Sequence, residues 1–426
     1  MRITSVVLAL IPLGVFVLGC ATTWELNQAA KTYVKLVLAV GRHDDNYVDA
    51  YYGPPAWKAE AGRGDPVPLP ELLAKVRGLR GEIEKTEAGP EDRRRFLLKQ
   101  VIAMEAHVRR LSGERMTLAE EARLLYDAEV PRHDAAEFAA AHEELERLVP
   151  GEGPLGPRVE ALRKAVYIPP DRIEKTLALA LDAARKANAA FVKLPAGEDF
   201  ETVLVKNKPW NAYNWYLGNF KSRIELNTDL PTELNGVFGT MCHEGYPGHH
   251  VYNTLLEERL VKGRDYVEFM VYPLYSPQSL LAEGTANVGI DILFSDDERR
   301  RVLTEVLAPA AGLSPDDVLA LDRIRESSKL LRYVNGEAAR MLLDDGVPEE
   351  DVVAFVRKWG LVTEEKARKS VQFAKAYRSY VFNYSLGEDI VHRWVGTGTD
   401  RTDRFFDLLT RPVVPSDLGD TPLFSK

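Results

Sequence analysis

The sequence predicts a mainly α protein with a small β element beside the helices that carry its most distinctive histidines. Helical periodicity dominates residues 70–192 and returns over residues 296–376. Between them, residues 201–205 and 221–227 alternate apolar and polar side chains, as strands do. A proline and a glycine then interrupt a helical pattern in which three of the eight histidines fall within eight residues. We therefore expect a large helical shell with a small sheet next to the histidines.

The elements follow from periodicity and from start and stop signals. A first helix is expected over residues 24–41, followed by a Gly/Pro-spaced loop to about residue 69. Further helices are predicted over 70–86, 91–112, 117–127, 132–148, 157–166 and 170–192. Thr117, with Glu120 three residues later, is a capping-box signal. Pro231 should open the histidine helix, Ser279 should begin the next, and residues 314–343 should form one long helix or a pair.

An aromatic stretch, residues 210–218, lies between the two predicted strands. It either packs in the core, which we favour, or forms a platform on the substrate side. The strand that contains Asn227 could align a peptide by backbone pairing.

The first twenty residues predict a lipoprotein signal peptide. Arg2 supplies a positive start, residues 6–18 form a nearly unbroken apolar run, and residues 17–20 (Val-Leu-Gly-Cys) resemble a bacterial lipobox. Cleavage before Cys20 would leave this cysteine as a lipid-modified N-terminus, and more than one acyl chain gives stable anchoring. We expect a protein of the bacterial cell envelope, attached to a membrane through Cys20. An uncleaved N-terminal anchor helix is the alternative.

Composition limits the partners and the covalent cross-links. The formal net charge is −9 and no long basic run occurs, which argues against a nucleic-acid partner. Hydrophobic residues make up 45% of the chain, enough to bury a sizeable core. Cys242 is the other cysteine, so lipidation of Cys20 would leave no partner for an intramolecular disulfide.

The most informative segment is residues 243–250, His-Glu-Gly-Tyr-Pro-Gly-His-His. Imidazole nitrogens and a nearby carboxylate are what a catalytic zinc ion requires, namely neutral ligands and a base. Glu283 follows His249 by thirty-four residues and completes a His2Glu set. The segment therefore predicts one zinc ion per chain, held by His243, His249 and Glu283, with Glu244 as the general base. A purely structural role for the cluster is the alternative.

The spacing of the histidines requires a break in the helix. His243 lies six residues before His249 and seven before His250, and seven residues span about 10 Å of a straight helix. Zinc–nitrogen bonds are only about 2 Å long, so a straight helix cannot close the site. Pro247 cannot donate to a carbonyl four residues earlier. The helix should bulge or kink there, and we prefer His249 to His250 as the second ligand.

The pattern His-Glu-x-x-Pro-Gly-His-His with a downstream glutamate resembles a large bacterial family of mostly uncharacterised proteins. That family is similar to the glutamate-zincin metallopeptidases, which include thermolysin and the helical carboxypeptidases. The resemblance covers roughly residues 165–395. The chain departs from the family around Glu283, where smaller residues than usual flank the glutamate. The resemblance implies a helical metallopeptidase-like fold, with a catalytic region over residues 166–426 that continues from an N-terminal helical region over residues 21–165.

The resemblance also implies roles for residues outside the ligand set. Asn287 lies where thermolysin-like enzymes place an aspartate that holds a ligand histidine. Tyr384 matches a family Tyr-x-x-Gly element and could donate to an oxyanion. Arg378 and His392 are further options, and Arg378 could bind a substrate's terminal carboxylate.

Taken together, these features predict a membrane-anchored zinc peptidase that hydrolyses short peptides with water that the metal activates. A zinc-dependent hydrolase of a non-peptide amide or ester is one alternative. A non-catalytic metal- or peptide-binding lipoprotein is another.

Overall fold

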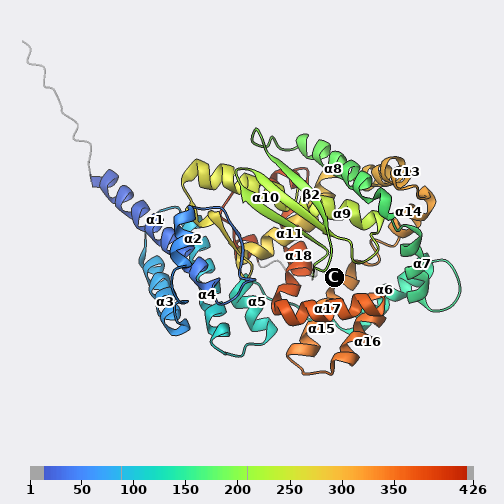
Figure 1. Ribbon diagram of the computed structural model, residues 1–426, viewed down its shortest axis with the longest axis horizontal. Coiled ribbons are helices and arrows are strands. Elements are labelled where there is room, and N and C mark those ends of the chain that lie inside the picture. The colour runs from blue at the N-terminus through green and yellow to red at the C-terminus, as the bar shows by residue number, and fades with distance from the viewer. Residues whose placement is uncertain (1–13, 88, 209, 420–426) are drawn as a thin grey trace, which may run out of the picture.

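A computed structural model describes residues 14–419 except 88 and 209, with the side chains of residues 14–24 left out. The protein is mainly α, as the sequence predicts. Figure 1 shows α1–α5 at one end, α7, α13 and α14 at the other, and α9 and α11 with the sheet between them.

The first part of the chain is helical apart from one short strand. It comprises α1 Gly14–Val40, β1 Val48–Tyr51, α2 Pro55–Ala61, α3 Leu69–Lys85, α4 Glu91–Leu111, α5 Leu118–Tyr126, α6 Ala135–Leu148, α7 Leu155–Ala165, the 3-10 turn η1 Pro170–Arg172 and α8 Ile173–Ala189. The predicted capping box of Thr117 and Glu120 is confirmed. The predicted loop to residue 69 is wrong in part, because β1 pairs with a later strand and Pro55 starts α2.

The middle part contains the strands and the histidine motif. It comprises β2 Asp199–Val205, β3 Ala212–Gly218, β4 Lys221–Asn227, α9 Leu234–Glu244, α10 His249–Leu256, the π segment η2 Glu257–Lys262, the 3-10 turn η3 Val267–Met270, β5 Val271–Pro273 and α11 Pro277–Leu293. Strand β4 is central, parallel to β2 and antiparallel to β3, and β1 pairs antiparallel with β5. A peptide therefore cannot pair with the Asn227 strand, since both of its edges are occupied.

The last part returns to helices. It comprises α12 Asp296–Arg301, η4 Val302–Leu307, α13 Ala308–Ala311, α14 Pro315–Asp322, η5 Lys329–Tyr333, α15 Val334–Leu343, α16 Glu349–Gly360, α17 Glu364–Tyr377, η6 Arg378–Val381, α18 Phe382–Val395, α19 Arg401–Leu408 and η7 Pro415–Leu418. The predicted helix over residues 314–343 is a pair, with α14 and α15 separated by turns.

A buried ion pair ties the N-terminal helices to the segment before β5. Arg93 of α4 donates to both carboxylate oxygens of Glu268 in η3, at 2.6 and 2.9 Å, and its other nitrogen donates to Asn27 of α1. Both charged side chains are buried. Removing one partner would leave an unpaired buried charge, so the pair fixes α1, α4 and η3 against one another.

Helix α11 runs through the interior and belongs to two hydrophobic cores. Leu280 packs with α1, α3, α4 and α5, whereas Leu281 packs in the core formed with α8, α9 and α10. Most side chains of α11 are buried on all sides, as is typical of a central helix.

Helix α11 meets α18 at two facing glycines. A Cβ on Gly284 would lie 2.3 Å from the carbonyl oxygen of Gly387, and one on Gly387 would lie 2.4 Å from the carbonyl oxygen of Leu280. Real Cβ atoms do not approach backbone this closely. The two helices can therefore touch only because neither residue has a side chain.

We predict that Gly284→Ala or Gly387→Ala lowers the free energy of unfolding by about 1–3 kcal/mol, because the added methyl group overpacks the contact. Gly78→Ala in α3 is the matched control, since no atom lies within 4 Å of the added Cβ, and it should stabilise the helix by up to about 1 kcal/mol. Urea unfolding of the variants measures both effects. Equal effects for the three variants would contradict the close packing of α11 and α18.

Candidate metal and active site

The histidine motif divides between two helices. Helix α9 ends at Glu244 and α10 begins at His249, with residues 245–248 outside both. The single bulged or kinked helix expected from the sequence is therefore corrected to a full break. The backbone N–H of Gly248 donates to the carbonyl of Cys242 at 3.0 Å. A Cβ on Gly248 would lie 1.7 Å from the carbonyl oxygen of His243, so the tight return of the chain needs glycine.

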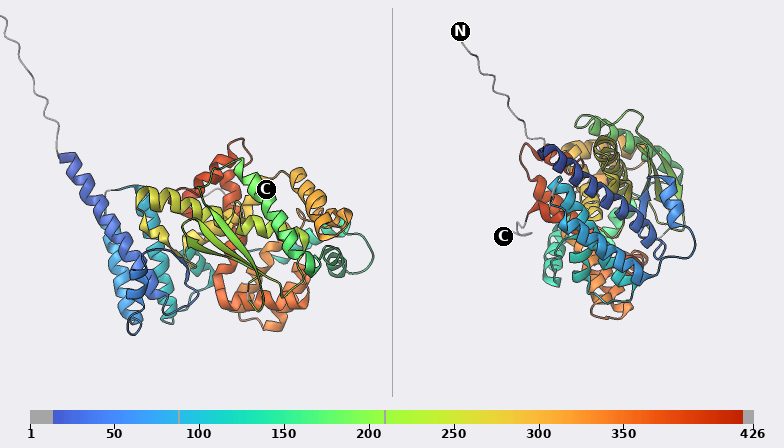
Figure 2. Two further views of the ribbon diagram at one scale, coloured as in Figure 1. Left: turned by 45° about the horizontal axis from the view of Figure 1, so that its top comes forward. Right: turned by 90° about the vertical axis from the view of Figure 1, so that its left-hand side faces the viewer.

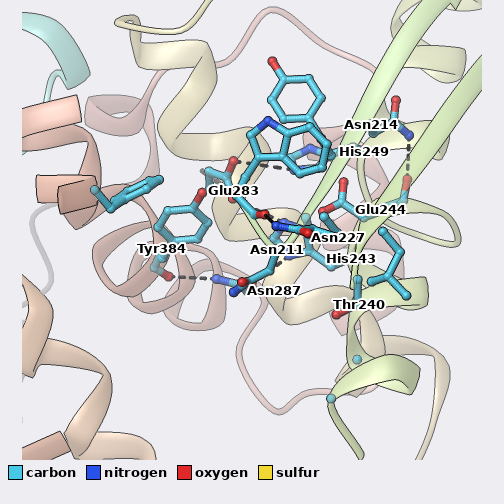
Figure 3. A pocket seen from close by; sticks show the side chains of 18 of the residues that line it. Asn211, Asn214, Asn227, Thr240, His243, Glu244, His249, Glu283, Asn287 and Tyr384 are labelled. Carbon is cyan, nitrogen blue, oxygen red and sulfur yellow. Dashed lines mark hydrogen bonds and ion pairs between the residues drawn. The ribbon is translucent and has the colours of Figure 1, made fainter. Parts of the chain in front are cut away.

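This return brings His249 beside His243 and both beside Glu283 of α11. The ring centroids of the histidines are 4.7 Å apart. Nε2 of His243 lies 3.3 Å from Glu283 Oε2, and Nε2 of His249 lies 3.6 Å from Glu283 Oε1. Ligand atoms of His243, Glu244 and His249 all lie within 4.8 Å of one another. Figure 3 shows these side chains converging on one wall of the cavity.

These donors fit a divalent cation. Oxygen Oε2 of Glu283 is buried and accepts no hydrogen bond within the described part of the chain. Two imidazole nitrogens and a carboxylate are the ligand chemistry of a His2Glu zinc centre. Burial would lower the pKa of His243, but Glu283 and Glu244 raise it to about 9. Burial would likewise raise the pKa of Glu283, but His249 and His243 hold it well below its usual value. Both pKa shifts have the same cause: the carboxylates attract positive charge to the two histidine rings.

Asn287 orients the first histidine. Nδ1 of His243 lies 2.9 Å from Asn287 Oδ1, so its N–H donates there and Nε2 faces Glu283. The side-chain nitrogen of Asn287 donates to the carbonyl of Tyr384 at 2.9 Å. Asn287 therefore links α9 to α18, and the expected contact of its side-chain oxygen with His243 is present.

His250 points away from this group. Its Nδ1 lies 2.8 Å from Ser222 Oγ and its Nε2 lies 2.9 Å from Glu198 Oε2, and the ring is fully buried. Successive residues of α10 point to different faces, so only one of the adjacent histidines can meet His243. The structure places His249 there.

Glu244 lies at the end of α9 with its carboxyl group in the cavity wall. Its backbone carbonyl accepts a hydrogen bond from Asn214 of β3 at 2.7 Å, which fixes the helix end to the sheet. Burial raises the pKa of its carboxyl group. Within the described chain, no lysine, arginine or histidine forms an ion pair with it. The carboxylate is therefore free to exchange a proton with a bound substrate or water.

Two tyrosines of the C-terminal region approach the site. The Tyr384 side chain lines the cavity and is partly exposed there. Loss of solvation, together with the negative charges of Glu283 and Glu244, raises the pKa of its hydroxyl, which remains a donor. The hydroxyl of Tyr380 donates to Glu283 Oε1 at 2.7 Å. Sequence reasoning missed Tyr380, although it lies four residues before Tyr384.

Arg378 and His392 do not line the cavity. Arg378 donates to Glu121 Oε1 at 2.7 Å, so its guanidinium is occupied by a carboxylate of α5. His392 has Glu388 and Asp291 as its nearest carboxylates, at 3.8 and 3.9 Å. The proposed substrate contacts of Arg378 and His392 are corrected accordingly.

The cavity above these residues has a volume of about 990 Å³. The aromatic stretch, residues 210–218, has two faces. Trp210, Tyr213 and Trp215 line the cavity, whereas Tyr216 is buried in the core. The preference for core packing is therefore wrong for the cavity-facing residues. The opposite wall comes from α17 and the segments after it, with Lys366, Lys369, Ser370, Phe373, Tyr377 and Tyr380.

Comparisons with known proteins add only distant likenesses. No protein-family model and no curated protein matches the chain. A protein from Colwellia psychrerythraea, provisionally described as a lipoprotein, has 15% sequence identity and a TM-score of 0.48, over 82% of this chain and 68% of its own. A provisionally described lipoprotein of unknown function from Shewanella oneidensis has 12% identity and a TM-score of 0.43, over 85% and 74% of the two chains.

Proposed function

We propose that this protein is a zinc-dependent hydrolase of short peptides. The observation that carries the proposal is the position of the Glu244 carboxylate, which lies beside the ligand atoms of His243 and His249 and opens into a large cavity. Zinc held by His243, His249 and Glu283 would act as a Lewis acid that polarises a substrate carbonyl and activates water. The rest of the chemistry falls to the side chains of this chain.

Glu244 is the proposed general base. Its carboxylate would accept a proton from the attacking water and return it to the leaving amine. Asn287 keeps the Nδ1 proton of His243 in place, and Tyr380 holds one oxygen of Glu283, so the ligand set is oriented before substrate arrives. Tyr384 can donate a hydrogen bond to the oxyanion that develops on the substrate.

Strand β3 is the proposed guide for the peptide. It is an edge strand of its sheet, and residues 210–215 line the cavity. An extended peptide can add to such an edge through backbone hydrogen bonds, with side chains on alternate sides. The helices that enclose the cavity favour short peptides over folded proteins.

We also propose that the protein is anchored to the bacterial cell envelope by lipid on Cys20. The support is the apolar run and the Val-Leu-Gly-Cys pattern at residues 17–20. Most of the predicted signal lies outside the described residues, and the side chain of Cys20 is not described. Within the described residues, the structure contains no helix that could span a membrane. Helix α1 projects from the body at its N-terminal end (Figure 2).

We predict about one zinc ion per chain for protein that lacks residues 1–20, as measured by elemental analysis. His243→Ala and His249→Ala should lose the metal, whereas His250→Ala should keep it, because its ring bonds to Ser222 and Glu198 instead. Circular dichroism checks that each variant is folded. Retention by His249→Ala together with loss by His250→Ala would reverse the ligand assignment.

We predict that Glu244→Gln binds zinc normally and loses about 10²-fold or more in turnover, because the amide keeps the shape of the side chain without its basicity. Glu283→Gln should instead weaken zinc binding. Cleavage of a mixed peptide library, followed by mass spectrometry with and without a chelator, provides the assay. Hydrolysis of non-peptide amides or esters alone would favour the first alternative function. Zinc-loaded protein that hydrolyses neither class would favour a binding protein.

We predict that Cys20→Ser abolishes labelling with a radioactive fatty acid and leaves an unprocessed precursor, because the modified thiol is absent. Cys242→Ser is the control, since this buried cysteine should not affect labelling. A mature wild-type N-terminus at another residue, without lipid, would refute the lipid anchor.

A further inference from the structure

Asp49 is a carboxylate of the cavity that the proposed mechanism does not use. It lies on β1, which pairs with β5, and its side chain lines the same cavity as Glu244 and Glu283. Burial, together with the negative charges of Glu283 and Glu244, raises the pKa of Asp49 well above its usual value. The fold therefore places a third carboxyl group in the cavity that Glu244 and Glu283 line.

Asp49 lacks the compensation that other carboxylates of this protein receive. Glu268 pairs with Arg93, Glu121 with Arg378, and Asp322 with Arg299 and Arg300. Within the described residues, the one hydrogen-bond partner of Asp49 is the hydroxyl of Tyr213, which donates to Oδ1. In the described part of the chain, no hydrogen bond reaches Oδ2, and no lysine, arginine or histidine forms an ion pair with Asp49. An unpaired carboxylate in a cavity is a position where a bound cation is favourable.

Aromatic side chains line the cavity together with this carboxylate. The ring of Tyr213 lies 4.5 Å from that of Trp215 and 5.5 Å from that of Trp210, centroid to centroid. Tyr377, on the opposite wall, is close enough to Asp49 for the carboxylate to raise its pKa further. A carboxylate and aromatic side chains in one cavity can together bind an ammonium group, through charge and through cation–π attraction.

We propose that Asp49 is a specificity-determining residue that binds an ammonium group of the substrate. The inference rests on the proposed function, because it concerns the substrate of the same site. The ammonium has two possible sources, the free α-amine of a peptide or a lysine side chain. Because Asp49, Glu244 and Glu283 line one cavity, the source that we favour is the α-amine of a peptide that is cleaved near its N-terminus, as by an aminopeptidase.

Binding can test this separately from catalysis. Zinc-loaded Glu244→Gln protein, which should not turn over substrate, is titrated calorimetrically with tetra-alanine and with N-acetyl-tetra-alanine. A second pair compares an N-acetylated tetrapeptide that contains lysine with the same peptide that contains norleucine. We expect the ammonium form of at least one pair to bind about tenfold to hundredfold more tightly, the usual effect of a hydrogen bond to a charged group.

Adding Asp49→Asn should abolish this preference, because the amide still accepts the bond from Tyr213 but carries no charge. Asp65→Asn is the control, since it removes an exposed aspartate that does not line the cavity, and it should leave the preference intact. Zinc content and the unfolding midpoint of both variants should match those of the parent protein.

The proposal is overturned if the ammonium forms bind no better than the neutral forms, if no peptide binds, or if Asp49→Asn keeps the preference. Selective binding that depends on Asp49, in a wild-type protein that cleaves no peptide, would support the inference while refuting the peptidase function. Peptide cleavage without any preference for the ammonium forms would support the peptidase function while refuting the role of Asp49.

Discussion

The close contact of α11 with α18 is the constraint on which the site depends. Gly284 and Gly387 allow the two backbones to touch, and the residues beside them on each helix then face the cavity. Glu283 directly precedes Gly284, and Tyr384 lies one helical turn before Gly387. The distance between the two helices therefore determines the positions of both side chains. Asn287 completes the junction through His243 and the carbonyl of Tyr384. This contact explains why a glycine follows Glu283.

The break between α9 and α10 brings His243 and His249 together, although they are six residues apart in the sequence. Six residues of continuous helix would separate the two imidazoles too far for one ion. Residues 245–248 instead return the chain against the last turn of α9, and His249 starts a new helix beside His243. The adjacent His250 is then directed to Glu198 and Ser222, where it stabilises the sheet side of the motif. Neighbouring histidines thus have different partners because they occupy different helix faces.

Two groups of carboxylates can be distinguished in this protein, those buried with an arginine partner and those in the cavity without one. Structural ones, such as Glu268, Glu121 and Asp322, have arginine partners that offset the cost of burial. In the cavity, the charged partners of Glu283 are the imidazoles of His243 and His249. Neither Glu244 nor Asp49 forms an ion pair within the described chain. Uncompensated charge of this kind is characteristic of sites that bind cations or exchange protons. The same distinction explains why Arg378 is structural, since Glu121 already occupies its guanidinium.

The sequence determined most of the helices, the two predicted β segments and the residues of the histidine motif, because periodicity and capping act over a few residues. The tertiary structure decided which distant segments meet. Tyr380 reaches Glu283 across 97 residues, and Tyr213 reaches Asp49 across 164. No local pattern encodes such contacts, and the same is true of the Arg378–Glu121 pair. They arise from the packing of α11 against α18 and of β1 beside β3, which depends on the whole core.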